Sequence, residues 1–212
     1  FRSMYVTYAF NFTGGALLKW YRDRLARCEA QLAAERGVSV YRLLDELGAR
    51  EPTDLIVIPH FAGSGTPDMN EAARGAFLGL SFDTDAPALY RALLEGVTYE
   101  MAYNMEALAQ AGIPIREVRA VGGGAKSAYW LGIKASIMGC RVVPLETDEA
   151  GIAGAAMLAG VAAGVYRGLP EAEPFFVKTR PPAEPDAAQQ KHYAAQYERY
   201  KRAREAIAGL YA

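Results

Sequence analysis

The sequence has little of what metal centres and disulfide-stabilised folds require. Its 212 residues include two cysteines, Cys28 and Cys140, and two histidines, His60 and His192. These four side chains lie far apart in the sequence, which excludes the closely spaced ligand pairs of a structural zinc site. Two cysteines are too few for a disulfide framework and are typical of a reducing compartment. We therefore expect a cytoplasmic protein whose fold depends on neither zinc nor disulfide bonds.

An excess of charge of either sign is also missing. Lysine plus arginine number 23 and aspartate plus glutamate number 24, so the net charge is −1. This balance provides no electrostatic footprint for nucleic acid or for an anionic membrane surface. Residues 150–166 are uncharged, but they are mostly alanine and glycine and fall short of the ~20 apolar residues that a membrane span needs. We therefore expect neither nucleic acid nor a membrane as a partner, and interpret Gly160 and Gly164 as sites of tight helix packing in a core.

What the chain does contain is an alternation of strand-like and helix-like segments. Hydrophobic residues make up 51% of it, enough to fill a sizeable core. Because the chain opens at Phe1 without a signal-peptide pattern, we interpret it as a piece of a longer protein. The predicted strands cover residues 5–11, 55–58, 118–121 and 141–145. Helices are predicted over residues 16–35, 87–111, 125–138 and 187–208, and the helix over 87–111 is expected to be amphipathic. Thr13 is expected to cap the first of these helices. Ser39 is expected to cap a further helical segment, and Thr147 another that ends near residue 164.

This alternation predicts an α/β fold with a mixed sheet flanked by helices. No internal repeat is visible, so we expect a single domain over residues 1–212. Prolines at 170, 174, 181, 182 and 185 predict an extended joint before the C-terminal helix, which lies within residues 185–212.

Three consecutive glycines form the most informative turn of the sequence. Gly122, Gly123 and Gly124 separate a predicted strand from a predicted helix, where glycine lets a ligand approach the backbone and a helix N-terminus attracts anions. Lys126 and Ser127 do not complete a P-loop, because alanine stands directly before the lysine. A dinucleotide fingerprint also fails, since it would need glycine or alanine at position 127. The turn thus favours a nucleotide, with a close helix–strand crossing and no ligand as the alternative.

Four segments resemble the FGGY family of carbohydrate kinases, which includes xylulokinase, gluconate kinase and glycerol kinase. The turn GGGAKSAYW is similar to the nucleotide-binding turn of that family. RGAFLGLSFDTDAPALYRALLEGVTYE, residues 74–100, resembles its C-terminal signature, with Gly75, Gly79, Leu80, Leu89, Ala92 and Glu95 in register. TDEAGIAGAAMLAGVAAG and FTGGALLKWYRD resemble two further helices of the family. The segments follow the order and spacing of the family and cover most of residues 5–165.

The resemblance implies an actin-like, ribonuclease H-like ATPase fold in which ATP gives its γ-phosphate to a hydroxyl of a sugar or polyol. This chain would be the C-terminal, nucleotide-binding lobe of a two-lobe kinase, incomplete at its N-terminal strands. The catalytic aspartate, most Mg²⁺ contacts and most sugar contacts would lie in the N-terminal lobe, so no catalytic or metal-binding residue is expected here. A homodimer is possible by the same resemblance.

The resemblance also implies which residues contact the nucleotide. Gly123, Gly124 and Ala125 would lie against the adenosine, and Ser127 and Ala128 beside the adenine or ribose. Gly15 and Lys19 match the opposite wall of the pocket, although a helix entry and a solvated lysine are the plainer interpretations. Two alternatives to the kinase remain open at this stage. One is a dinucleotide-binding oxidoreductase domain, suggested by Glu146 downstream of the glycine turn, and the other is a non-catalytic actin-like binding module.

Several other residues are given structural interpretations. Asp83, Thr84 and Asp85 could bind a metal ion but are more typical of a helix-capping loop. His60 is expected in a loop without an acidic partner, and Trp130 in the core. The cluster of Arg199, Lys201, Arg202 and Arg204 is interpreted as a solvated helix face.

Overall fold

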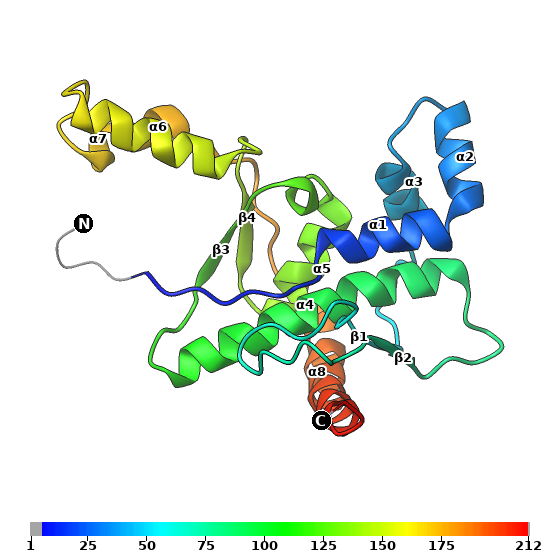
Figure 1. Cartoon of the computed structure of the whole chain (residues 1–212). Coiled ribbons are helices and arrows are strands. Elements are labelled where there is room, and N and C mark those ends of the chain that lie inside the picture. Colours follow the sequence, from blue (N-terminus) through cyan, green and yellow to red (C-terminus); the bar gives the residue numbers. More distant parts are fainter. Residues whose placement is uncertain (1–5, 212) are drawn as a thin grey trace.

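The computed structural model describes residues 6–211 (Figure 1). The helices are α1 (Gly15–Arg24), α2 (Arg27–Glu35), α3 (Val40–Leu47), α4 (Ala86–Gln110), the 3₁₀ turn η1 (Gly123–Ala125), α5 (Ala128–Met138), α6 (Ala150–Ala162), α7 (Leu169–Phe176) and α8 (Ala187–Ala208). The strands are β1 (Ile56–Ile58), β2 (Ala76–Leu78), β3 (Glu117–Ala120) and β4 (Arg141–Pro144). The predicted α/β class is confirmed, and the C-terminal helix spans the predicted residues.

The strands form two small sheets. β1 pairs antiparallel with β2, placing Val57 opposite Phe77. β3 pairs parallel with β4, placing Val118 opposite Val142. The last part of the proline-rich joint continues this second sheet, because backbone hydrogen bonds join Val142 and Ala183 in both directions. The prediction of an extended joint is wrong for Pro170 and Pro174, which lie in helix α7, where Pro170 stands in the first turn that tolerates proline. Antiparallel and parallel pairing therefore both occur, and the joint is held as an extended edge beside β4.

Helix α4 forms the centre of the molecule (Figure 1). Its residues from Tyr90 to Glu100 are all buried, because β1, α1, α3, α5 and α8 pack around it. The prediction of an amphipathic helix is therefore wrong for this half of α4, where no face is left for solvent. Gly96 permits the close crossing over β1, since a Cβ there would lie 2.5 Å from the Val57 carbonyl oxygen. Asp85 caps the helix by accepting a hydrogen bond from the Ala88 N–H at 2.8 Å, as the capping interpretation predicts.

The N-terminal segment differs from its prediction in two ways. Tyr5 lies outside the described residues, and residues 6–11 form no strand. Within the described part of the chain, their backbone forms hydrogen bonds with the loop at Thr66 and with no neighbouring strand. The single helix expected over residues 16–35 is two helices, because the chain bends at Ala26, which is 1% exposed and packs into the core. Thr13 is not the N-cap of α1: its hydroxyl donates to the Pro59 carbonyl, and Gly14 occupies the N-cap position.

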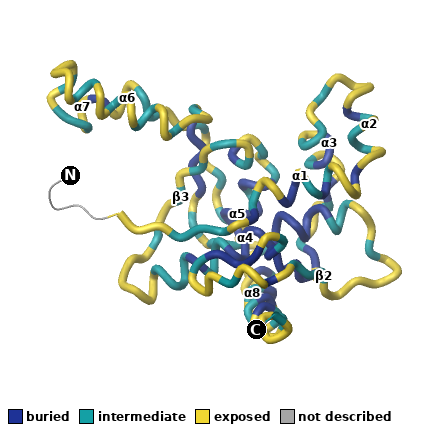
Figure 2. Tube along the Cα trace, viewed as in Figure 1, coloured by how far each residue is buried: buried dark blue, intermediate teal, exposed yellow. Residues whose placement is uncertain are grey.

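Helices α6 and α7 project from the rest of the chain and are mostly exposed (Figures 1 and 2). No residue of α6 is buried, so the interpretation of Gly160 as a core-packing glycine is wrong. Gly160 instead faces Tyr166, whose ring would lie 2.7 Å from a Cβ at that position. Thr147 is not the N-cap of α6 either, since Glu149 precedes the helix and Thr147 accepts a local bond from the Glu149 N–H. Within residues 6–211, no helix combines the length and the apolar character that crossing a membrane requires.

The polar helix α8 is more buried than its sequence indicates. Arg204 is 6% exposed and pairs with Glu100 at 3.2 Å and with Asp68 at 2.5 Å, so its interpretation as part of a solvated face is wrong. Tyr200 donates to the same Glu100 carboxylate. His60 lies at the end of β1, is 7% exposed, and has its Nε2 3.2 Å from Glu100, an acidic neighbour that the sequence did not indicate. These contacts hold α8 against α4 across about 100 residues of sequence.

Candidate functional site

A cavity of about 770 Å³ lies between the glycine turn with α5 on one side and α1 with α3 on the other. This volume is within the range of small-molecule and cofactor sites. Its wall contains Gly15, Leu18, Ser39, Tyr41, Arg42, Asp45, Glu46, Arg50, Tyr90, Gly123, Gly124, Lys126, Ser127, Ala128, Tyr129, Trp130 and Lys134. The cavity is formed by segments more than 100 residues apart, so its shape depends on α4 holding both walls in place.

The glycine turn forms one edge of the cavity directly after β3. Gly122 has φ +77°, a left-handed conformation that side chains disfavour, so glycine is needed there to start the turn. A Cβ on Gly123 would meet open space, whereas a Cβ on Gly124 would lie 2.9 Å from the Trp130 ring. Glycine at position 124 is thus required by packing inside the protein, as the alternative interpretation of a close helix–strand crossing predicted. Gly123, in contrast, presents bare backbone to the cavity.

The N-terminus of α5 points to the same cavity. Ser127 caps the helix by accepting from the Trp130 N–H at 2.9 Å, and Ala128 begins it. Unpaired N–H groups and the helix dipole make such an end favourable for anions. Lys126 lies at the exposed rim and pairs with Asp148 at 2.6 Å. This side of the cavity is therefore suited to a ligand with an anionic group near its opening.

The opposite wall is contributed by α3 and α4. The Tyr90 hydroxyl donates to Asp45 at 2.8 Å. Burial raises the pKa of Asp45 above its ordinary value, and hydrogen bonds from Ser127 and Tyr90 partly offset this effect. Tyr41 and Arg42 complete the wall near the opening. The cavity thus offers hydrogen-bond acceptors as well as donors.

The inner wall of the cavity contains an unusual pair, Trp130 and Lys134. Trp130 is 5% exposed and its indole N–H donates to Leu94 and Thr98, which confirms it as a core residue. Lys134 is 7% exposed, and its Nζ lies 3.8 Å from the centroid of the Trp130 ring. The same Nζ donates to the Gly124 carbonyl at 3.3 Å. Burial lowers the pKa of Lys134 from 10.5 to about 8.

Five of the seven residues predicted to contact a nucleotide line this cavity: Gly15, Gly123, Gly124, Ser127 and Ala128. The other two do not. Ala125 is 2% exposed and lies beneath the turn, where its carbonyl accepts from Arg180 at 2.8 Å. Lys19 is on an exposed face of α1 and is absent from the wall. The structure therefore brings together the two predicted walls, but not through every residue that the sequence suggested.

The wall formed by α3 and the lysine at position 134 were not predicted from the sequence. Tyr41 and Asp45 are four residues apart and so share one face of a helix, but nothing in the sequence indicates that this face meets the glycine turn. Lys134 had a visible signal, because it is the lone charged residue of the apolar segment AYWLGIKASIM. A lysine four residues after Trp130 on such a helix must share its buried face.

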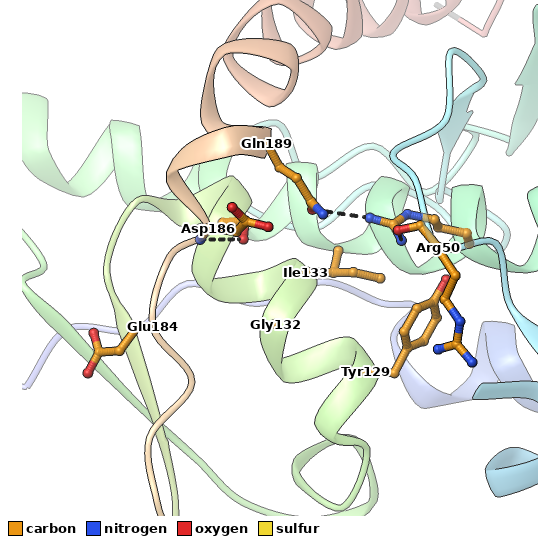
Figure 3. A pocket seen from close by; sticks show the side chains of 9 residues that line it. Arg50, Tyr129, Gly132, Ile133, Glu184, Asp186 and Gln189 are labelled. Atoms are coloured by element: carbon orange, nitrogen blue, oxygen red, sulfur yellow. Dashed lines mark hydrogen bonds between the residues drawn. The ribbon is translucent and has the colours of Figure 1, made fainter. Parts of the chain in front are cut away.

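A second, smaller cavity of about 200 Å³ lies behind Tyr129 (Figure 3). Arg50 and Tyr129 line both cavities, and the Tyr129 hydroxyl donates to the Ala49 carbonyl at 2.5 Å. Figure 3 shows Asp186 and Gln189 at the start of α8, where Gln189 accepts a hydrogen bond from the Arg91 guanidinium at 3.3 Å. Tyr129 therefore separates the two cavities and anchors the segment before β1.

The Arg91 guanidinium behind this second cavity is fully paired. It donates to Glu95 at 2.7 Å, to the Ala49 and Arg50 carbonyls at 2.8 and 2.6 Å, and to the Tyr193 hydroxyl at 2.7 Å. Because the charge and its donors are satisfied inside the protein, this group is structural. It fixes the segment at Ala49 and Arg50 that forms part of the larger cavity.

No metal-binding cluster accompanies the cavity. Across residues 6–211, no group of three or more histidine, cysteine, aspartate or glutamate side chains is arranged to hold a metal ion. Asp83 and Asp85 belong to the capping loop of α4 instead.

Similar arrangements are found in known proteins. Residues 1–163 match the model of the C-terminal domain of the FGGY family of carbohydrate kinases. The chain is 28% identical over 200 residues to a xylulose kinase of Bacillus subtilis, covering 94% of this chain and 39% of that kinase. It is 32% identical over 196 residues to a glycerol kinase of Rhodopirellula baltica, covering 90% of this chain and 35% of that kinase.

A solved structure shows the same fold. The chain superposes on the xylulose kinase from Rhodospirillum rubrum with a TM-score of 0.81 and 27% identity, covering 95% of this chain and 39% of that one. The chain thus spans less than two fifths of the length of the relatives named here. The actin-like ATPase fold that the resemblance implied is confirmed by this likeness.

Proposed function

Because the chain belongs to the FGGY family of carbohydrate kinases, through its C-terminal domain, we propose that it is the nucleotide-binding lobe of an ATP-dependent sugar or polyol kinase. The observation that carries this proposal is the cavity of about 770 Å³ between the glycine turn and α3. Its bare Gly123 backbone, the α5 N-terminus and its acceptors suit a nucleoside with phosphates at the opening. The relatives named above are kinases, which favours this function over an oxidoreductase domain.

The contribution of this chain to the reaction would be binding and orientation. Phosphoryl transfer depends mainly on positioning the phosphates and neutralising their charge, with little covalent chemistry by the protein. The walls on α3 and α5 would fix the nucleoside so that the γ-phosphate projects out of the cavity. The N–H groups at the start of α5 would support the phosphate chain electrostatically.

Mg²⁺ and the acceptor hydroxyl need groups beyond those found here. The residues present do not fit a metal site, as the absence of a ligand cluster in the described part of the chain indicates. We propose that the ion, the base that accepts the hydroxyl proton, and most sugar contacts belong to the other lobe. A cytoplasmic location and a homodimer stay predictions.

The proposal is tested with the complete polypeptide that contains these residues. Purified protein with Mg-ATP is screened against pentoses, hexonates and small polyols, with ADP release as the readout. We expect turnover with one class of acceptor and a measurable Kd for ATP. Absence of ATP binding would overturn the proposal, whereas binding without turnover on any acceptor would favour the non-catalytic module.

Two glycine substitutions sharpen this test. Gly123→Ala adds a methyl group toward the cavity, and we expect it to weaken ATP binding about tenfold through steric overlap. Gly132→Ala is the matched control, since Gly132 is in α5, also has open space, and lines only the smaller cavity. Gly124→Ala is unsuitable because its methyl group would strike Trp130 and perturb the fold.

A further inference from the structure

Lys134 is a buried cation that lacks an anionic partner. Its side chain forms no ion pair with any part of the chain that the structure describes, and burial alone accounts for the lowering of its pKa. One protein acceptor, the Gly124 carbonyl, lies within hydrogen-bond distance, at 3.3 Å. An ammonium group has three N–H donors, so two are left for other acceptors.

The position of Lys134 points those donors at the inner end of the larger cavity. Lys134 and Trp130 line the cavity together, and Leu18 and Tyr90, both buried, line it with them. The other charged residues of the wall are Arg42, Asp45, Glu46, Arg50 and Lys126. Arg42 and Lys126 are 72% and 62% exposed, so they mark the opening.

The two ends of the cavity suit different parts of a nucleotide. A phosphate is costly to bury and is favoured at the open end, beside solvent and the start of α5. A flat, largely apolar base is favoured at the inner end, beside the buried side chains of Leu18 and Tyr90. Nζ covers the Trp130 ring at 3.8 Å from its centroid, so a base placed at this end meets the ammonium group and not the ring.

Building on the proposed function, we propose that Lys134 donates a hydrogen bond to a ring nitrogen of the nucleobase and so determines which nucleotides the cavity accepts. The ring nitrogens N1, N3 and N7 of adenine are acceptors. Each of them is converted to a C–H group, which cannot accept, in the corresponding deaza analogue.

The test measures Kd for ATP and for 1-deaza-, 3-deaza- and 7-deaza-ATP by calorimetry on the complete polypeptide. We expect one analogue to bind the wild type about tenfold more weakly than ATP, as for a hydrogen bond from a charged donor. K134M keeps the volume of the side chain without its donors. It should bind ATP about tenfold more weakly and lose the discrimination between that analogue and ATP.

K126M is the matched control, because it removes an ammonium group from the rim of the same cavity. It should keep the wild-type discrimination among the four nucleotides. If the wild type binds ATP and all three analogues equally, or if K134M retains the discrimination, the role of Lys134 is wrong while the proposed function stands. If the wild type binds no nucleotide, both fail. If K134M does not fold, K134Q replaces it in the same measurements, and equal binding of all four nucleotides by the wild type still overturns the role of Lys134.

Discussion

The buried pair Arg91–Glu95 offers the sharpest test of how the fold supports its cavity. The two side chains are 3% and 1% exposed, and Nε lies 2.7 Å from Oε1. Glu95 also accepts from the Thr53 hydroxyl at 2.6 Å and from Tyr193 at 3.1 Å. Glu95→Ala would therefore leave a buried guanidinium without its counter-charge and two hydroxyl groups without an acceptor.

We expect Glu95→Ala to lower the free energy of unfolding by about 3 kcal/mol. Breaking a buried ion pair from one side costs roughly 3–5 kcal/mol. The lower end applies because Arg91 keeps the Ala49 and Arg50 carbonyls as acceptors. For a chain of this length, the loss corresponds to a fall in Tm of roughly 6–12 °C. Urea unfolding followed by circular dichroism measures it.

The chain carries its own control for this prediction. Arg42 and Glu46 form another arginine–glutamate pair with the same four-residue spacing on a helix, at 3.0 Å, but their side chains are 72% and 53% exposed. Glu46→Ala should therefore stay within about 0.5 kcal/mol of the wild type. If Glu95→Ala and Glu46→Ala have equal effects, the assignment of Arg91 and Glu95 as a desolvated structural pair is refuted. Full additivity in an Arg91→Met, Glu95→Met double variant would refute it as well.

Three further predictions concern stability. Lys134 has a pKa lowered from 10.5 to about 8, so its burial destabilises the fold fully below pH 8 and progressively less as the pH rises toward 10.5. K134M should thus raise stability by about 3 kcal/mol at pH 7 and by much less near pH 10.5, as measured in thermal scans at both pH values. Gly96→Ala would place a methyl group 2.5 Å from the Val57 carbonyl and should cost about 2–3 kcal/mol in urea unfolding, and a loss below 0.5 kcal/mol would contradict the close crossing. Asp85→Ala removes the acceptor for the Ala88 N–H at the start of α4 and should cost about 1 kcal/mol, which Asp85→Ser should largely restore.

The elements that the sequence predicted well have strong local causes. The Asp85 cap, the proline in the first turn of α4 and the glycine after α5 are local signals, and the helices they bound were predicted within a few residues. The glycine turn was identified for the same reason, since Gly122 needs a positive φ whatever surrounds it. The break at Ala26 was missed because it allows this residue to pack into the core. The helical sequence pattern of residues 16–35 contains no local signal for that contact.

The candidate site also combines features with local causes and features that depend on tertiary packing. The family and the glycine turn could be identified from the sequence, because both depend on residue types at fixed spacing. Tertiary packing places Asp45 and Tyr90 opposite that turn, buries Ala125, and brings Lys134 against Trp130 without a carboxylate partner, and none of these contacts follows from local sequence. Burial and pairing depend on which surfaces α4 brings together, and those surfaces come from segments more than 100 residues apart.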